Sequence, residues 1–235
     1  MRPSGEEGAL PAVTGLAASG TAADGDGRRH RPRSATLRGR IDATLRGLRA
    51  LDGAVYAAVA ATPAPTLDTA LRRLSQAADH SRISFALAAA LATVPGRPRQ
   101  AAAAGVCAIA VASASADLVG KRLVRRSRPD REAARVAMAR HVPMPASASF
   151  PSGHTASAVA FAAAVGSVLP LAGPPLGLLA AAVGYSRVHT GVHYPGDVAA
   201  GALLGLASAA AVRECATCRR IRGPLNTPTS GRRGG

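Results

Sequence analysis

The stretch FPSGHTASAVAFAAAVGSVLPLA, residues 150–172, joins a short polar island to a long apolar block. Alanine favours helix, and the block is too long and too uniformly apolar for an alternating strand. The block also lacks the polar stripe that a helix on the surface of a soluble protein needs. The stretch therefore predicts a helix in an apolar environment, with polar side chains gathered at its start.

Four more Ala-rich apolar blocks share this composition, at residues 83–95, 101–119, 174–185 and 198–212. Most are shorter than the roughly 20 residues that cross a bilayer, but small neutral flanks can extend each of them. Between residues 146 and 212 the only charged residues other than His are Arg187 and Asp197. We therefore predict an all-α integral membrane bundle of about five transmembrane helices, or six if Leu51–Ala61 adds a short span.

Most of the formal charge of +16 on the 235 residues lies outside these blocks. We expect a disordered basic tail over residues 1–35, amphipathic or interfacial helices over 36–80, a membrane-embedded domain over 81–212 and a basic flexible tail over 213–235. Within the second region, the sequence predicts a short helix from Thr66 to Ala78 with Thr66 as its cap. The basic ends suit anionic headgroups of membrane lipids.

Three polar islands interrupt the apolar blocks, at residues 120–129, 150–155 and 185–197. Successive spans reverse direction, so the helix ends that carry these islands all meet on one face of the membrane. Ionisable residues at such positions in a membrane protein are functional candidates. This shared face predicts a single site built from all three islands.

Several groups in the islands suit the binding of phosphate. Lys121, Arg128 and Arg187 supply donors for phosphate oxygens, and the arginines bind through a planar fork. Lys121 is the one Lys among 29 basic residues, which makes its position within an island notable. Ser152 and Gly153 open a predicted helix, whose first backbone N–H groups form an anion site.

The islands also hold groups for nucleophilic and acid–base chemistry. His193 and His154 can serve as nucleophile and acid–base partner. Asp197 follows His193 by four residues and can fix its tautomer. His189, His193 and Asp197 also have the spacing of a metal-binding helix face, but Pro195 would break that helix. We therefore predict no metal site.

Together the islands resemble the three-part signature of the type 2 phosphatidic acid phosphatase superfamily. That superfamily includes membrane lipid phosphatases and, more distantly, soluble vanadium haloperoxidases. The resemblance covers roughly residues 80–212. It is carried by Lys121-x6-Arg128-Pro129, by Pro151-Ser152-Gly153-His154 and by Ser186-Arg187-x5-His193-x3-Asp197.

The resemblance implies a phosphatase that needs neither metal nor cofactor and acts through a phosphohistidine. By similarity, His193 attacks phosphorus, Asp197 holds it in position, and His154 protonates the leaving oxygen. The phosphate oxygens are bound by Lys121, Arg128, Ser152, Gly153 and Arg187. The implied substrate is a lipid phosphate monoester or diphosphate, such as a polyprenyl phosphate, phosphatidic acid or phosphatidylglycerol phosphate. The implied location is a bacterial plasma membrane, with the site facing its extracytoplasmic side.

Two other functions remain open at this point. The same pocket also fits a vanadate-dependent haloperoxidase, although the apolar spans argue against it. The basic ends also fit a non-catalytic protein that binds anionic lipid or nucleic acid. An aromatic content of 3% offers few side chains on which bases could stack, so we predict no nucleic-acid partner. Three further arginines of the first island, Arg122, Arg125 and Arg126, are expected to be solvated or to face headgroups. The oligomeric state stays undetermined.

Overall fold

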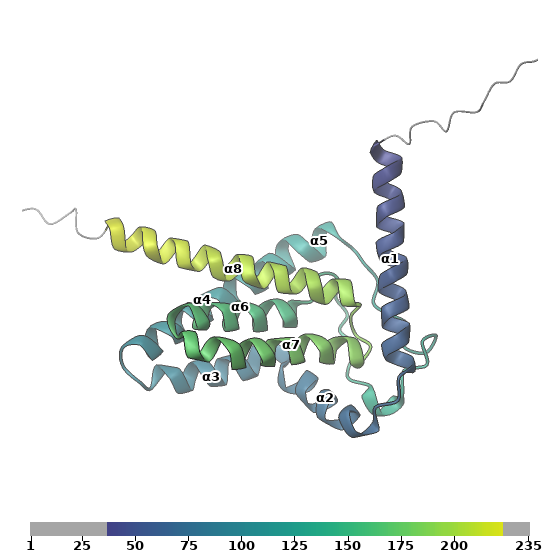
Figure 1. Ribbon diagram of the computed structural model, residues 1–235, viewed down its shortest axis with the longest axis horizontal. Helices are drawn as coiled ribbons and strands as arrows, with labels where there is room; N and C mark the ends of the chain where they lie inside the picture. Colours follow the sequence, from purple (N-terminus) through teal and green to yellow (C-terminus); the bar gives the residue numbers. More distant parts are fainter. Residues whose placement is uncertain (1–36, 223–235) are drawn as a thin grey trace, which may run out of the picture. The chain divides into compact units, whose positions relative to one another are not determined.

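The computed structural model describes residues 37–222, apart from the side chains of 119–121 and 218–222, and over this range it contains helices and no strand. The predicted all-α class is confirmed for these residues. The helices, labelled in Figure 1, are α1 (Leu37–Ala61), α2 (Pro65–Ala77), α3 (Arg82–Ala92), α4 (Arg97–Ser115), α5 (Lys121–Leu123), α6 (Gly153–Val168), α7 (Gly173–His189) and α8 (Pro195–Arg222). Short 3₁₀ turns occur at Asp79–Ser81, Met138–Arg140 and Pro170–Ala172, and α4 runs into a π-helical turn at Ala116–Gly120.

The chain divides into two compact units after Asp42, within α1. The described part of the second unit, residues 43–222, holds all of the packing discussed below. In this unit α6 is the central helix, because it packs against α4, α7 and α8, while α3 packs against α4 (Figure 1). The predicted tail over 1–35 lies outside the described residues, and so does the part of the predicted 213–235 tail that follows Arg222, whereas residues 213–222 belong to α8.

The core of the second unit is built almost entirely from small side chains. Five alanines that line the contacts of α6 with α4 and α8 are fully or almost fully buried, namely Ala108, Ala112, Ala156, Ala160 and Ala164. Small residues let helix backbones approach closely where apolar surroundings offer little other driving force. The contact of α6 with α8 is therefore set by backbone proximity more than by interlocking large side chains.

Two glycines of α8 show how close this approach is. A Cβ atom placed on Gly201 would lie 2.5 Å from the carbonyl oxygen of Ser152, and one on Gly205 would lie 2.5 Å from that of Ala156. Real Cβ atoms do not approach backbone oxygen so closely, so both positions require glycine. The start of α6, where Ser152 lies, is thereby fixed against α8.

Three helix boundaries differ from those predicted. The α2 helix begins at Pro65 with Ala64 as its cap, and Thr66 makes no capping hydrogen bond, so the predicted cap was wrong. Proline is favoured in the first turn because its missing N–H is not needed there. The α1 helix continues unbroken through Leu51–Ala61, and α8 continues beyond residue 212 to Arg222.

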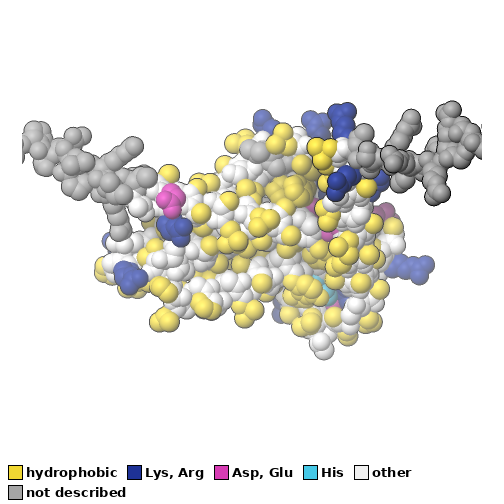
Figure 2. Space-filling view, turned by 45° about the horizontal axis from the view of Figure 1, so that its top comes forward, with side chains coloured by type: hydrophobic (Ala, Val, Ile, Leu, Met, Phe, Trp, Pro, Cys, Tyr) yellow, Lys and Arg dark blue, Asp and Glu magenta, His cyan; other side chains and the backbone are white. Residues whose placement is uncertain are grey.

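Two described segments are long and apolar enough to cross a bilayer, Arg97–Leu118 and Pro195–Thr217, while Gly153–Val168 is apolar but shorter. Large apolar side chains also lie on the outside of the helices, including Leu171, Leu178 and Leu203. Figure 2 shows hydrophobic side chains spread across the face in view, with basic side chains mainly near its edges. The number of spans stays a prediction.

Candidate active site

The three polar islands surround one cavity of about 670 Å³. It lies where α4 and α7 end and α6 begins, and the long connection between α5 and α6 forms part of its wall. Five of the predicted site residues line it: Arg128, Gly153, His154, Arg187 and His193. Apolar side chains of α3 and α4, among them Phe85, Val106 and Ile109, line the same cavity. A polar end and an apolar wall therefore share one space.

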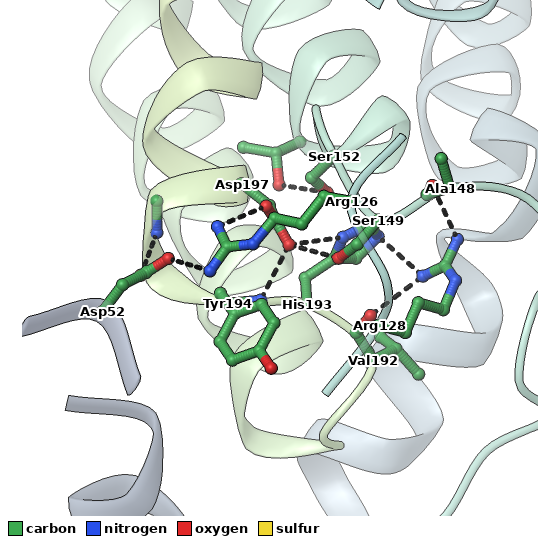
Figure 3. Close-up of polar contacts among 12 residues, drawn as sticks. Asp52, Arg126, Arg128, Ala148, Ser149, Ser152, Val192, His193, Tyr194 and Asp197 are labelled. Carbon is green, nitrogen blue, oxygen red and sulfur yellow. Dashed lines mark hydrogen bonds and ion pairs between the residues drawn. The ribbon is translucent and has the colours of Figure 1, made fainter. Parts of the chain in front are cut away.

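The contact between His193 and Arg128 fixes the tautomer of the histidine. Nη1 of Arg128 lies 3.3 Å from Nε2 of His193 (Figure 3). A guanidinium can only donate, so Nε2 must be the accepting, unprotonated nitrogen. The proton then sits on Nδ1, which lies 3.5 Å from Oδ2 of Asp197, at the outer limit of a hydrogen bond. His193 thus presents a lone pair on Nε2 at the cavity.

Burial keeps this imidazole neutral. His193 is 2% exposed, and desolvation lowers its pKa below the ordinary value of 6.5. The hydrogen-bonding influence of Asp197 raises the pKa in part, while the nearby charges of Arg128 and Arg187 lower it further. A neutral imidazole is the form that can attack an electrophile.

Asp197 is fully buried and is held by donors from three parts of the chain (Figure 3). Its Oδ2 accepts hydrogen bonds from Oγ of Ser149 and, at 2.9 Å, from the N–H of Tyr194. Its Oδ1 accepts one at 3.0 Å from Nη1 of Arg126. Hydrogen bonds to the charged form stabilise a carboxylate in a buried place. Asp197 is therefore a fixed anion behind His193.

Arg126 was expected to be solvated or to face headgroups, and this expectation was wrong. Its side chain is only 24% exposed, and besides Asp197 it pairs with Oδ2 of Asp52 at 2.6 Å. The guanidinium carbon also lies 4.0 Å from the ring centroid of Tyr194. Its neighbours Arg122 and Arg125 are exposed, as expected. No local pattern distinguishes Arg126 from them, because its partner Asp52 comes from α1.

Asp79, a carboxylate that sequence reasoning missed, also lines the cavity. Oδ1 of Asp79 lies 2.9 Å from Nε2 of His154 and 3.5 Å from Nη1 of Arg187. Arg187 is 2% exposed and also donates to Oγ of Ser75 at 2.7 Å. Both Ser75 and Asp79 precede the polar islands in sequence, and nothing in their local pattern signals a site.

Ser152 and Gly153, at the start of α6, have different surroundings. Ser152 is fully buried, and its N–H donates to the backbone oxygen of Asp197 at 2.9 Å. Its Oγ accepts a hydrogen bond from Oγ1 of Thr155 at 3.0 Å. Gly153, not Ser152, lines the cavity, and a Cβ atom on it would meet nothing within 4 Å. The structure thus leaves room beside the first backbone N–H groups of α6.

Two other predicted residues lie apart from this cluster. The side chain of Lys121 is not among those that the structure describes, so its predicted role stays a prediction. His189 is buried and does not line the cavity, since its Nε2 lies 2.9 Å from Oδ1 of Asp68, which also accepts from Nε of Arg140 at 2.9 Å. A structural role for His189 fits these contacts.

Comparisons with known proteins identify the family of the chain. The sequence profile of the PAP2 superfamily matches residues 102–220. The decaprenylphosphoryl-5-phosphoribose phosphatase of Mycobacterium tuberculosis is 41% identical over 148 residues, which cover 60% of this chain and 76% of that protein.

Two crystal structures share the fold. LpxE of Aquifex aeolicus has a TM-score of 0.59 at 24% identity, covering 70% of this chain and 95% of that one. The transmembrane PAP2-type phosphatidylglycerolphosphate phosphatase of Bacillus subtilis has a TM-score of 0.58 at 22% identity, covering 73% and 87%. From the matched profile, the related phosphatase and the convergence of the three islands on one cavity, it follows that this chain belongs to the PAP2 superfamily and is a phosphatase.

Proposed function

We propose that the protein is an integral membrane phosphatase that hydrolyses a lipid phosphate through a phosphohistidine at His193. The observation that carries this proposal is the lone pair on Nε2 of His193, which faces the cavity beside Arg128 and is backed by buried Asp197. Nucleophile and anionic support are thus oriented before substrate binds, which lowers the cost of reaching the transition state.

In the first step, Nε2 of His193 forms a bond to phosphorus as the bond to the leaving lipid oxygen breaks. Asp197 stabilises the positive charge that develops on the imidazole. Arg128 and Arg187 stabilise the charge on the equatorial oxygens, together with the backbone N–H groups at the start of α6. Nε of Arg187 has no acceptor among the described residues, so this guanidinium retains a donor that suits a phosphate oxygen. Lys121 joins this set by resemblance.

His154 completes both half-reactions. Its imidazolium gives a proton to the leaving oxygen in the first step, and the neutral ring accepts a proton from water in the second. As His154 takes this proton, the water oxygen forms a bond to phosphorus, the N–P bond breaks, and inorganic phosphate leaves with His193 again neutral. His154 ends the cycle protonated, as it began, and no atom changes its oxidation state.

The apolar wall of the cavity supports a lipid substrate. Phe85, Val106 and Ile109 lie along the same space as His154 and His193, so a chain attached to the phosphate ester can follow this wall. The related mycobacterial protein is named for decaprenylphosphoryl-5-phosphoribose. We therefore place a polyprenyl-phosphate-linked sugar phosphate first among substrates, ahead of phosphatidic acid and phosphatidylglycerol phosphate. The site is proposed to face the extracytoplasmic side.

The test is phosphate release by the purified full chain in detergent, with each of these lipids and with EDTA present throughout. We expect turnover that EDTA leaves unchanged and that His193→Ala abolishes. Acid quenching with a substrate labelled in the phosphate should trap label on the wild-type protein and not on His193→Ala. Glu214→Gln is the control, because Glu214 is exposed near the C-terminal end of α8, whereas the site lies at the start of this helix. Full activity of His193→Ala would refute the mechanism.

A further inference from the structure

Asp79 occupies a strained turn at the edge of the cavity. It begins the 3₁₀ turn between α2 and α3, and the next two residues, His80 and Ser81, have φ values of 54° and 57°. Residues other than glycine rarely adopt this left-handed conformation, and it persists only where the surroundings enforce it. In this conformation the turn places the carboxylate of Asp79 in the cavity, in contact with His154 and Arg187.

We propose that Asp79 is a positioning residue for His154, holding its ring through Nε2 so that Nδ1 faces the leaving oxygen. This inference rests on the proposed phosphatase mechanism. An ionised carboxylate can only accept, so the 2.9 Å contact keeps a proton on Nε2 of His154. Proton exchange with the substrate and with water then takes place at Nδ1.

The two histidines are thereby held in complementary ways. Asp197 lies near Nδ1 of His193, so that Nε2 carries the lone pair for attack, whereas Asp79 binds Nε2 of His154, so that Nδ1 is the nitrogen that exchanges a proton. One carboxylate supports a nucleophile, which must be neutral when it attacks. The other supports an acid, which must be protonated when it acts, and a nearby negative charge favours that protonated form.

The other charges near His154 make this support necessary. Arg187, His193, Arg128, Asp117 and His80 line the same cavity as His154. The positive charge of Arg187 disfavours a protonated His154, and Asp79 opposes this effect because it contacts both side chains. Asp79 also ties His154 to Arg187, which Ser75 anchors from α2. Its carboxylate therefore favours the protonated form of the acid and fixes its orientation.

The chain offers a matched control for this constellation. Asp68 accepts from Nε2 of His189 and Nε of Arg140, both at 2.9 Å, so it has the same kinds of partner as Asp79. These three residues are buried and do not line the cavity. Substitution of Asp68 thus removes the same type of contact without touching the proposed acid.

The experiment compares Asp79→Asn, Asp79→Glu and Asp68→Asn with the wild-type full chain in detergent. It measures kcat and KM for lipid phosphate hydrolysis across pH, and the melting temperature of each protein. For Asp79→Asn we expect a fall in kcat of about tenfold to a hundredfold, with a smaller change in KM. The basic limb of the kcat profile should move to lower pH by about one unit, because the imidazolium loses its nearby anion.

Asp79→Glu should restore part of the loss and return the limb toward its wild-type position. Asp68→Asn should lower the melting temperature and leave the limb in place. The inference is overturned if Asp79→Asn keeps the wild-type profile, or if it loses activity while the basic limb stays where it was and Asp79→Glu rescues nothing. Absence of hydrolysis by the wild-type protein would instead refute the proposed function, so the two failures are distinguishable.

Discussion

Arg126 offers a quantitative test of how the buried carboxylate of Asp197 is supported. Substitution by Ala removes a 3.0 Å contact with buried Asp197, a 2.6 Å contact with Asp52 and the packing of the guanidinium on Tyr194. Removal of one partner from a fully buried ion pair costs about 3–5 kcal/mol. Arg126 is 24% exposed, and Asp197 keeps its contacts with Ser149 and Tyr194, so we expect a loss of about 2–3 kcal/mol in the free energy of unfolding.

The contribution of Asp52 follows from a double-mutant cycle. Asp52→Ala removes the contact with Arg126 and a 2.6 Å hydrogen bond from the N–H of Gly196, at a cost of about 1–2 kcal/mol. The double variant should cost about 1 kcal/mol less than the sum of the single ones, since the mutual contact is lost only once. In a chain of this size, the loss in Arg126→Ala corresponds to a fall in melting temperature of about 5–10 °C.

Equilibrium unfolding in mixed detergent micelles, together with thermal melting, measures these quantities. Arg125→Ala is the control, because Arg125 is the exposed neighbour and should change stability by less than about 0.5 kcal/mol. Strictly additive effects of Arg126→Ala and Asp52→Ala would refute the coupling. Equal stabilities of Arg126→Ala and Arg125→Ala would refute the role assigned to Arg126 altogether.

Three other predictions follow from the site and its packing. Because burial lowers the pKa of His193 and the proposed mechanism requires its neutral ring, the acid limb of kcat/KM against pH should lie below 6.5; a limb at or above 6.5 would contradict this. Ser149→Ala removes a donor to Asp197 and should lower kcat about tenfold in a phosphate-release assay, while unchanged kcat would show that the other donors suffice. Gly201→Ala should lower the melting temperature by an amount that corresponds to about 1–3 kcal/mol, whereas Gly177→Ala, with open space around it, should not; equal melting temperatures would refute the close approach of α8 to Ser152.

The parts of the fold that sequence could predict are those with a local cause. The apolar Ala-rich blocks have a uniform composition that favours helix, and α3, α4, α6, α7 and α8 each contain one of them. The alternation of helix direction placed the three islands at one end of the bundle, and five residues predicted from them line one cavity. Each of these five residues was identified from the spacing of residues within its own segment. This local signal is why the sequence could predict that they line the cavity.

The missed residues all depend on distant partners. Asp52, Asp68 and Asp79 look like ordinary acids on amphipathic helices or in turns, and their partners lie 72 to 144 positions away along the chain. Arg126 lies in a run of similar arginines, so only the position of Asp52 distinguishes it. Helix periodicity and motif spacing describe a segment by itself, whereas these contacts arise from tertiary packing.

The region before the matched profile therefore matters for anyone who would transplant this enzyme. The profile begins at residue 102, yet Asp52, Asp68 and Asp79 precede it and pair with Arg126, Arg140 and His154 inside it. A chimera that grafted only residues 102–220 onto another scaffold would carry all three motifs but would lack Asp52 and Asp79, which contact Arg126 and His154, and Asp68, which pairs with Arg140. The smallest segment suitable for transfer must therefore start before Asp52. A library of variants in α1 and α2 would alter the surroundings of the proposed site without changing any of the three motifs.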